Sequence, residues 1–205
     1  MSRLRIVVSQ RCDAVAGRDE VRDALDQRLA ALLWELGFLP LPLASAISAP
    51  ADYLAALAPD GILLSGGNDI GSAPLRDALE KAALDYAVQH GLPVLGMCRG
   101  MQFIVQYQGG SLRSVPGHTA MRHRVFGSLV GDVGREVNSY HDYGLLDADL
   151  GDELEAVAWA EDGVVEALRH RESPWLGIMW HPERETLVAE ADRLLIKSVF
   201  MSANQ

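Results

Sequence analysis

A cysteine between two glycines carries the sharpest chemical signal in the sequence, at Gly96-Met97-Cys98-Arg99-Gly100. An apolar, strand-like run precedes it and a helical stretch follows. A nucleophile here would sit on a tight, strained turn, and glycines two residues before and after it leave room for the crowded backbones. The positive end of the following helix favours the thiolate, and the N–H of Arg99 can stabilise an oxyanion. We predict that Cys98 is a nucleophile; the alternative is an inert, buried cysteine that packs as a small apolar residue.

His181 is the histidine best placed to act as the general base of this nucleophile. It follows an apolar strand-like run, and Glu183 comes two residues later. Residues i and i+2 of an extended segment face the same side, so the Glu183 carboxylate can hold the imidazole tautomer and stabilise the imidazolium. The carboxyl ends of parallel strands meet at one edge of a sheet, which can bring His181 beside Cys98.

The other histidines that we considered are predicted to be structural. His90 and His170 are interpreted as surface or hydrogen-bonded residues. His118 and His123 have no third ligand beside them, so no metal site is predicted.

A glycine pair closes a second apolar run, in Ser65-Gly66-Gly67-Asn68-Asp69. The segment matches neither the dinucleotide-binding glycine pattern nor a phosphate-binding loop. By itself it would be a plain turn. Beside a thiol nucleophile it can supply a second oxyanion N–H, from Gly67 or Asn68.

The elements that must position these residues alternate between strand-like and helix-like segments. Strands are predicted over 4–9, 38–43, 61–65, 92–97 and 174–180. Helices are predicted over 19–36, 51–57, 74–90, 99–108 and 186–201. The inward positions of the last helix are predicted to be Leu187, Ala191, Leu194, Leu195 and Val199. Such alternation indicates βαβ units and a parallel sheet.

The second half of the chain differs, because several short β-rich pieces lie between residues 121 and 170. They are at 135–141, 154–160 and 164–170. We therefore predict one α/β domain over residues 1–205, with a mixed or antiparallel extension.

Composition restricts the class of protein. The chain has 205 residues and a net charge of −10, from 18 Lys+Arg and 28 Asp+Glu, which argues against a nucleic-acid-binding protein. No apolar run approaches the ~20 residues of a membrane span, and the start is too short in apolar residues for a signal peptide. With two cysteines only, Cys12 and Cys98, the chain is predicted to be cytoplasmic and free of disulfides.

Four motifs in order, GGND, GMCRGMQ, VNSYHDYG and WHPER, resemble those of class I glutamine amidotransferases, in the γ-glutamyl hydrolase branch. The resemblance implies a flavodoxin-like, doubly wound α/β sheet with a small β-rich extension. It also implies cysteine-dependent hydrolysis of a γ-glutamyl amide through a glutamyl thioester, without a cofactor. By the same resemblance Cys98 is the nucleophile, His181 the acid/base and Glu183 its orienter, and Gly67 and Arg99 supply oxyanion N–H groups. The implied substrate-binding residues are Asn68, Gln102, Asn138, Ser139, Tyr140 and His141.

Within that family, a narrower likeness is to γ-glutamyl-CDP-amidate hydrolases of capsular phosphoramidate biosynthesis. It depends on SQR after the first strand, GFLPLPL, LSGGND and VNSYHDYG. It implies release of glutamate and cytidine diphosphoramidate. An anionic leaving group needs local cations, and the candidates are Arg11, Arg99, Arg122 and Arg124. For Arg122 and Arg124, pairing with surface acids is an equal alternative.

Other functions are compatible with the same residues. The chain could hydrolyse another γ-glutamyl amine, or act as a glutaminase subunit that delivers ammonia to a separate partner synthetase. A third possibility is a catalytically inactive binding domain, against which the intact set of Cys98, His181 and Glu183 argues.

Overall fold

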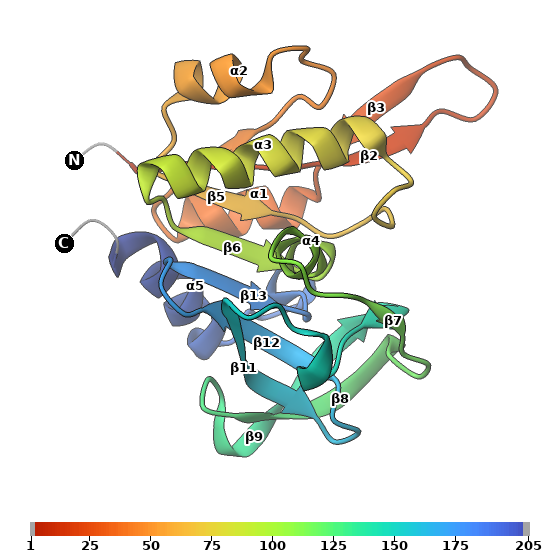
Figure 1. The fold of residues 1–205 in the computed structure, drawn as a ribbon, viewed down its shortest axis with the longest axis vertical. Helices are drawn as coiled ribbons and strands as arrows, with labels where there is room; N and C mark the ends of the chain where they lie inside the picture. The colour runs from red at the N-terminus through yellow and green to blue at the C-terminus, as the bar shows by residue number, and fades with distance from the viewer. Residues whose placement is uncertain (1–2, 203–205) are drawn as a thin grey trace.

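Nine strands form one sheet in a computed structural model of the chain, which describes residues 3–202, and Figure 1 shows the sheet running through the molecule. The strand order is β4-β1-β5-β6-β13-β12-β11-β8-β9. One half is parallel and contains β4 (Leu39–Pro42), β1 (Arg5–Val8), β5 (Gly61–Leu64), β6 (Val94–Met97) and β13 (Trp175–Ile178). The other half is antiparallel and contains β12 (Val165–His170), β11 (Leu154–Ala160), β8 (Thr119–Gly127) and β9 (Gly131–Tyr140).

Helices cover both faces of the parallel half (Figure 1). One face packs against α2 (Pro50–Leu57), α3 (Pro74–His90) and α4 (Arg99–Tyr107). The opposite face packs against α1 (Gln27–Glu35) and α5 (Glu190–Ser202). The arrangement is the predicted doubly wound α/β sheet with an antiparallel extension. Because β5 and β6 are covered on both sides, every residue of these two strands is buried.

Parallel pairing brings the ends of β5, β6 and β13 to the same edge of the sheet. Gly177 pairs with Gly96 and Ile178 with Met97, so the two strands end side by side. The chain leaves β6 directly into Cys98, and it leaves β13 three residues before His181. The predicted meeting of strand ends is therefore present, and the loop after β5 joins it.

The predicted helix over 19–36 is wrong in its first half. Residues 11–24 form a hairpin of β2 (Arg11–Ala14) and β3 (Val21–Ala24), and α1 begins only at Gln27. The Asp26 carboxylate caps this helix by accepting from the N–H of Arg28 at 2.9 Å. Val21, which matches the apolar period of the predicted helix, lies on β3 and is 68% exposed. An apolar residue can match a period of 3.6 without belonging to a buried face.

The closing helix is also shorter than predicted, and its inner face differs. It begins at Glu190, and Leu187, Ala191 and Leu194 are exposed rather than inward. Leu195 and Val199 pack against the core, as predicted, around the buried side chains of Ile196 and Phe200. The physical reason is Asp192, which is buried on the inner face and accepts a hydrogen bond from Nε1 of Trp180 at 3.0 Å. Because this charged residue lies on the inner face, the pattern of apolar residues in the sequence does not show which side of α5 faces the core.

Smaller elements complete the fold. Two short strands, β7 (Arg113–Ser114) and β10 (Tyr143–Gly144), pair with each other, and 3-10 turns lie at η1 (Asp147–Asp149) and η2 (Pro182–Arg184). No helix within residues 3–202 is long and apolar enough to cross a membrane.

Candidate active site

Cys98 occupies a strained turn between β6 and α4. Its φ of 51° and ψ of −108° lie in a region that side-chain-bearing residues rarely adopt. The flanking glycines are sterically required. A Cβ on Gly96 would lie 2.6 Å from the backbone of Gly100, and a Cβ on Gly100 would lie 2.0 Å from the carbonyl oxygen of Leu64. The turn is tied to β13 by a hydrogen bond of 2.7 Å from the Cys98 N–H to the Ile178 carbonyl.

His181 and Glu183 form a buried pair at the end of β13. Nδ1 of His181 lies 2.7 Å from Oε1 of Glu183. A Cβ on Gly66 would lie 2.7 Å from Cε1 of His181 and 3.7 Å from Cβ of Cys98, so the loop after β5 contacts both side chains. Burial by itself would lower the pKa of His181, but the Cys98 thiol and the Glu183 carboxylate outweigh it and raise that pKa to about 9. The site therefore favours the imidazolium form of His181 beside the Cys98 sulfur.

Strand β9 holds the backbone of His181 in place. The Asn138 amide accepts from the His181 N–H at 2.8 Å and donates to the His181 carbonyl at 2.8 Å. The ring of Tyr140 packs edge-on against the imidazole, with 5.9 Å between ring centroids. The antiparallel half thus positions a residue that the parallel half carries.

Two backbone N–H groups, one on the loop after β5 and one directly after Cys98, have no acceptor among the residues described. Among residues 3–202, neither the N–H of Gly67 nor that of Arg99 donates a hydrogen bond to the protein. Gly67 has a φ of +84°, which glycine adopts without strain. These are the two groups predicted to stabilise an oxyanion.

Arg76 on α3 orients the loop after β5, a role that the sequence did not indicate. Its guanidinium is fully buried and donates to the carbonyl oxygens of Ser65, Gly66 and Gly67 at 2.7, 3.1 and 2.5 Å. In a trans peptide the N–H points opposite to the C=O. Because these carbonyls face Arg76, the N–H groups of Gly66, Gly67 and Asn68 point away from it.

Arg76 belongs to a buried ion network under the site. It pairs with Glu80 at 2.8 Å, and Glu80 and Asp77 both bind the Arg99 guanidinium. Burial lowers the pKa of Arg76, and the Glu80 carboxylate opposes that effect. The hypothesis that the Arg99 side chain binds an anionic leaving group is therefore wrong, because its charge is already paired. An Arg and a Glu four residues apart on a helix usually indicate an exposed pair, so only the topology reveals this network.

Several residues implied as substrate-binding make hydrogen bonds inside the protein instead. The Asn68 amide bonds the N–H and carbonyl of Cys12 at 2.8 and 3.0 Å, and Nε2 of Gln102 donates to the Tyr143 carbonyl at 2.7 Å. The Ser139 hydroxyl donates to the His118 carbonyl at 2.5 Å. With Asn138 and His141, these side chains indicate positioning roles rather than direct substrate contact.

The candidates with accessible side chains are Tyr140 and Arg11. Tyr140 is 44% exposed beside His181. Arg11 is exposed at the start of β2 and pairs with Asp13 at 2.7 Å. A cavity of about 280 Å³ contains Arg11, Gly67, His181 and Glu183 in its wall.

Arg184, which the sequence did not single out, also lines this cavity, and its guanidinium lies 4.7 Å from the centroid of the Tyr140 ring. Arg122 is bonded to Glu136 and Glu185 at 2.6 and 2.8 Å, as the surface-pairing alternative expected. The guanidinium of Arg124 lies 5.8 Å from the Phe126 ring centroid. The cations of the cavity are therefore Arg11 and Arg184.

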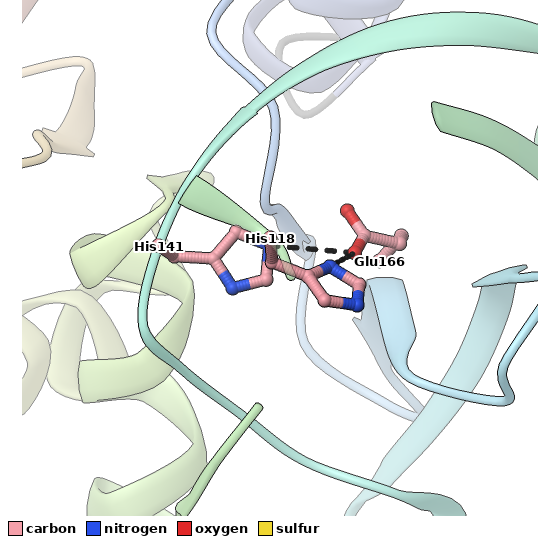
Figure 2. A group of neighbouring side chains, drawn as sticks. All are labelled: His118, His141 and Glu166. Carbon is pink, nitrogen blue, oxygen red and sulfur yellow. Dashed lines mark ion pairs between the residues drawn. The ribbon is translucent and has the colours of Figure 1, made fainter. Parts of the chain in front are cut away.

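A second polar cluster lies in the antiparallel half, where His118, His141 and Glu166 face one another (Figure 2). His123 approaches the same carboxylate. The prediction that His118 and His123 lack a further ligand is wrong, because strand pairing brings Glu166 and His141 to them. These residues are far apart in sequence, so no local spacing could have shown the cluster.

Comparison with known proteins places the chain among glutamine amidotransferase-like enzymes. The Peptidase C26 family model matches residues 9–183. The chain is 33% identical over 154 residues to the γ-glutamyl-CDP-amidate hydrolase of Campylobacter jejuni. The aligned residues make up 72% of this chain and 72% of the relative. It is 33% identical over 131 residues to a glutamine-hydrolysing GMP synthase subunit of Methanococcus aeolicus, covering 60% of this chain and 64% of that one.

The fold agrees with solved structures. A putative GMP synthase subunit from Thermoplasma acidophilum superposes with a TM-score of 0.75 at 21% identity, covering 98% of this chain and 94% of that one. A glutamine amidotransferase from Thermotoga maritima gives a TM-score of 0.65 at 15% identity, covering 95% and 82%. The flavodoxin-like α/β fold of the class I glutamine amidotransferase type is thereby confirmed.

Proposed function

Because the chain belongs to the peptidase C26 family and is a glutamine amidotransferase-like C–N amide hydrolase, we propose that it cleaves γ-glutamyl amides with Cys98 as its nucleophile. His181 is the acid/base, and Glu183 orients it. The observation that carries the proposal is the convergence at one sheet edge of a strained cysteine and a buried His–Glu pair.

The reaction proceeds in two halves. His181 takes the Cys98 proton, and the thiolate attacks the side-chain amide carbon of the γ-glutamyl group. The N–H groups of Gly67 and Arg99 stabilise the oxyanion. The imidazolium protonates the departing nitrogen, the C–N bond breaks, and a glutamyl thioester remains on Cys98. His181 then takes a proton from water, whose oxygen attacks the thioester carbon. The C–S bond breaks, glutamate is released, and His181 returns the proton to the Cys98 sulfur.

The proposed leaving group is an anionic nucleotide amidate, so that γ-glutamyl-CDP-amidate would give glutamate and cytidine diphosphoramidate in the cytoplasm, for capsule synthesis. Two observations support this substrate. The Campylobacter jejuni relative is named for it. In addition, Arg11 and Arg184 line the cavity of an acidic protein, beside the carboxylates of Asp26 and Glu183. Arg11 and Tyr140 are the proposed substrate contacts.

A glutaminase subunit that serves a separate synthetase is the second candidate. The likeness to the GMP synthase subunit of Methanococcus aeolicus favours it. Hydrolysis of another γ-glutamyl amine is a further variant of the first candidate.

The nucleophile is tested by treating the two thiols of the chain separately. We expect Cys98→Ala to reduce turnover of a γ-glutamyl anilide by at least about 10³-fold, with an unchanged circular dichroism spectrum. Cys12→Ala is the matched control and keeps wild-type kinetics. Acid quenching of the wild-type reaction should give a Cys98 peptide heavier by one glutamyl group, and hydroxylamine should convert the thioester to a hydroxamate. Turnover by Cys98→Ala at the wild-type rate would refute the mechanism.

A further inference from the structure

Four side chains meet in the antiparallel half of the sheet, apart from the cysteine and its histidine. His118 precedes β8, His123 lies on β8, His141 follows β9, and Glu166 lies on β12. Nδ1 of His118 and Nε2 of His141 lie 3.3 and 3.4 Å from Oε1 of Glu166 (Figure 2). Nε2 of His123 lies 3.3 Å from Oε2 of the same carboxylate.

The atoms that face one another are buried and have no hydrogen bond. Glu166 is 0% exposed, and neither of its carboxylate oxygens has a hydrogen-bond partner among the residues described. The same is true of Nδ1 of His118, Nε2 of His123 and Nε2 of His141. Buried polar atoms in native proteins are nearly always satisfied. Attraction between these groups alone would leave all five atoms without hydrogen bonds. One cation among them would bind the three ring nitrogens and the carboxylate.

The outer nitrogens of two rings fix the tautomers that a metal requires. Nε2–H of His118 donates to the Asp162 carboxylate at 2.9 Å, and Nδ1–H of His141 donates to the Tyr143 carbonyl at 3.0 Å. Each ring therefore carries a proton on its outer nitrogen, which leaves the inner nitrogen, facing Glu166, as the atom that can bind a metal once it is deprotonated. Metal-binding histidines are oriented by such outer bonds to carboxylates and backbone carbonyls.

The spacing and the ligand types fit zinc. Ligand atoms about 2.0–2.2 Å from Zn²⁺ stand about 3.3–3.5 Å apart in a tetrahedron. The contacts of His118 and His141 with Oε1 of Glu166 have this length, and His123 lies equally near Oε2. The ligand atoms of His118, His141 and Glu166 all lie within 4.8 Å of one another. Several imidazoles with one carboxylate are typical of zinc, whereas Mg²⁺ and Ca²⁺ prefer oxygen ligands.

We propose that His118, His141 and Glu166 form a structural site for a divalent zinc ion, with His123, which lies at the other oxygen of the same carboxylate, as the candidate fourth ligand. With His123 bound the site is closed, because four protein ligands leave no position for a substrate. It joins β8, β9 and β12 next to the segment that carries Asn138 and Tyr143. Through these two residues it braces the backbone of His181 and the side chain of Gln102. The ion takes no part in the chemistry at Cys98.

Metal content of the purified full-length chain tests the proposal directly. We expect about one zinc per chain by mass spectrometry of the dissolved protein, after dialysis against a weak chelator. Glu166→Gln and His141→Ala should reduce this content at least 10-fold, while His90→Ala and His170→Ala should not change it. Cys98→Ala should retain the zinc, which excludes binding by the thiol. A strong chelator should lower the Tm of the wild type and leave that of Glu166→Gln unchanged.

Cobalt substitution tests the site without any variant. Co²⁺ added to metal-free wild-type chain should give the intense visible absorption of a tetrahedral complex, and one equivalent of zinc should abolish it. The site does not exist if the wild type neither retains zinc nor binds added zinc or cobalt. Zinc that stays at full occupancy in both Glu166→Gln and His141→Ala would equally overturn the proposal.

Discussion

At the residue scale, His181 is fixed both through its ring and through its backbone. Glu183 holds Nδ1, the Tyr140 ring packs on the edge of the imidazole, and Asn138 bonds the N–H and carbonyl of the same residue. A base held in this way needs little reorganisation before it transfers a proton, which is where positioning contributes most to rate.

Glu183→Gln should slow the reaction and shift its pH dependence. The base survives, but the imidazolium loses its carboxylate, so we expect kcat to fall on the order of 10²- to 10⁴-fold. The Glu183 carboxylate also helps to raise the pKa of His181 to about 9. If loss of the imidazolium sets the alkaline limb of kcat/KM, that limb should lie near pH 9 in the wild type and at lower pH in the variant.

The matched control for this variant is Glu190→Gln, because the Glu190 side chain is 75% exposed and distant from the imidazole in the chain. It should keep both the rate and the pH profile of the wild type. Should Glu183→Gln match the wild type in both respects, another group would have to orient His181.

Residues with a local signature could be predicted, and residues without one could not. The flanking glycines indicate Cys98 as a nucleophile, and the spacing of two residues from His181 indicates Glu183 as its partner. Arg76 and Glu166 are single charged residues inside regular elements, and only long-range pairing gives them buried partners. The same limit explains why Asn138 and Gln102 looked like substrate ligands although they bind the protein itself.

At the scale of elements, α3 supports the loop after β5 through one guanidinium. Arg76→Lys keeps a positive charge near Glu80 but cannot hold three carbonyl oxygens in one fork. We expect the Gly67 N–H to lose its orientation, and kcat to fall about 10²-fold with a small change in KM, as when one oxyanion donor is removed. Steady-state kinetics with a γ-glutamyl anilide measure kcat and KM separately and so test this expectation.

Lys81→Met is the control on the same helix, since Lys81 pairs with Asp85 at the surface. It should leave kcat and KM unchanged. A purely structural role for Arg76 would instead lower Tm and the amount of active enzyme without altering kcat per titrated Cys98, and that result would contradict the role in positioning.

Elements with a clean apolar pattern were predicted well, and those with mixed patterns were not. Helix α3 has the predicted bounds, and β5 and β6 lie within the predicted runs because they are buried on both faces. Residues 21–24 pair with residues 11–14 in a hairpin instead of forming a helix, and this pairing has no local apolar signal in the sequence. That hairpin bears on the proposed function, because it carries Arg11 to the cavity.

At the scale of the whole molecule, three parts that are separate in sequence line one cavity. They are the loop after β5, the segment after β13 that carries His181 and Glu183, and the hairpin that carries Arg11. The antiparallel half contributes indirectly, because Asn138 and Tyr140 contact His181. The molecule carries a net charge of −10, so its overall field repels an anionic substrate. Arg11 and Arg184 place two guanidinium groups in the wall of the cavity, beside the carboxylates of Asp26 and Glu183, and we expect these cations to contact a leaving group that carries negative charge.

This cavity predicts the order of substrates for the purified chain without a partner. A large anionic leaving group offers binding energy that can orient the scissile amide, and free glutamine offers only ammonia. We expect kcat/KM for γ-glutamyl-CDP-amidate to exceed that for a simple γ-glutamyl amine by more than ~100-fold, or about 2.7 kcal/mol. Arg11→Gln should reduce the value for the nucleotide adduct about 10-fold and leave the amine unaffected. Arg124→Gln, at an exposed arginine outside the cavity, should change neither. If free glutamine is hydrolysed as well as the conjugates, the glutaminase subunit becomes the better description of the enzyme.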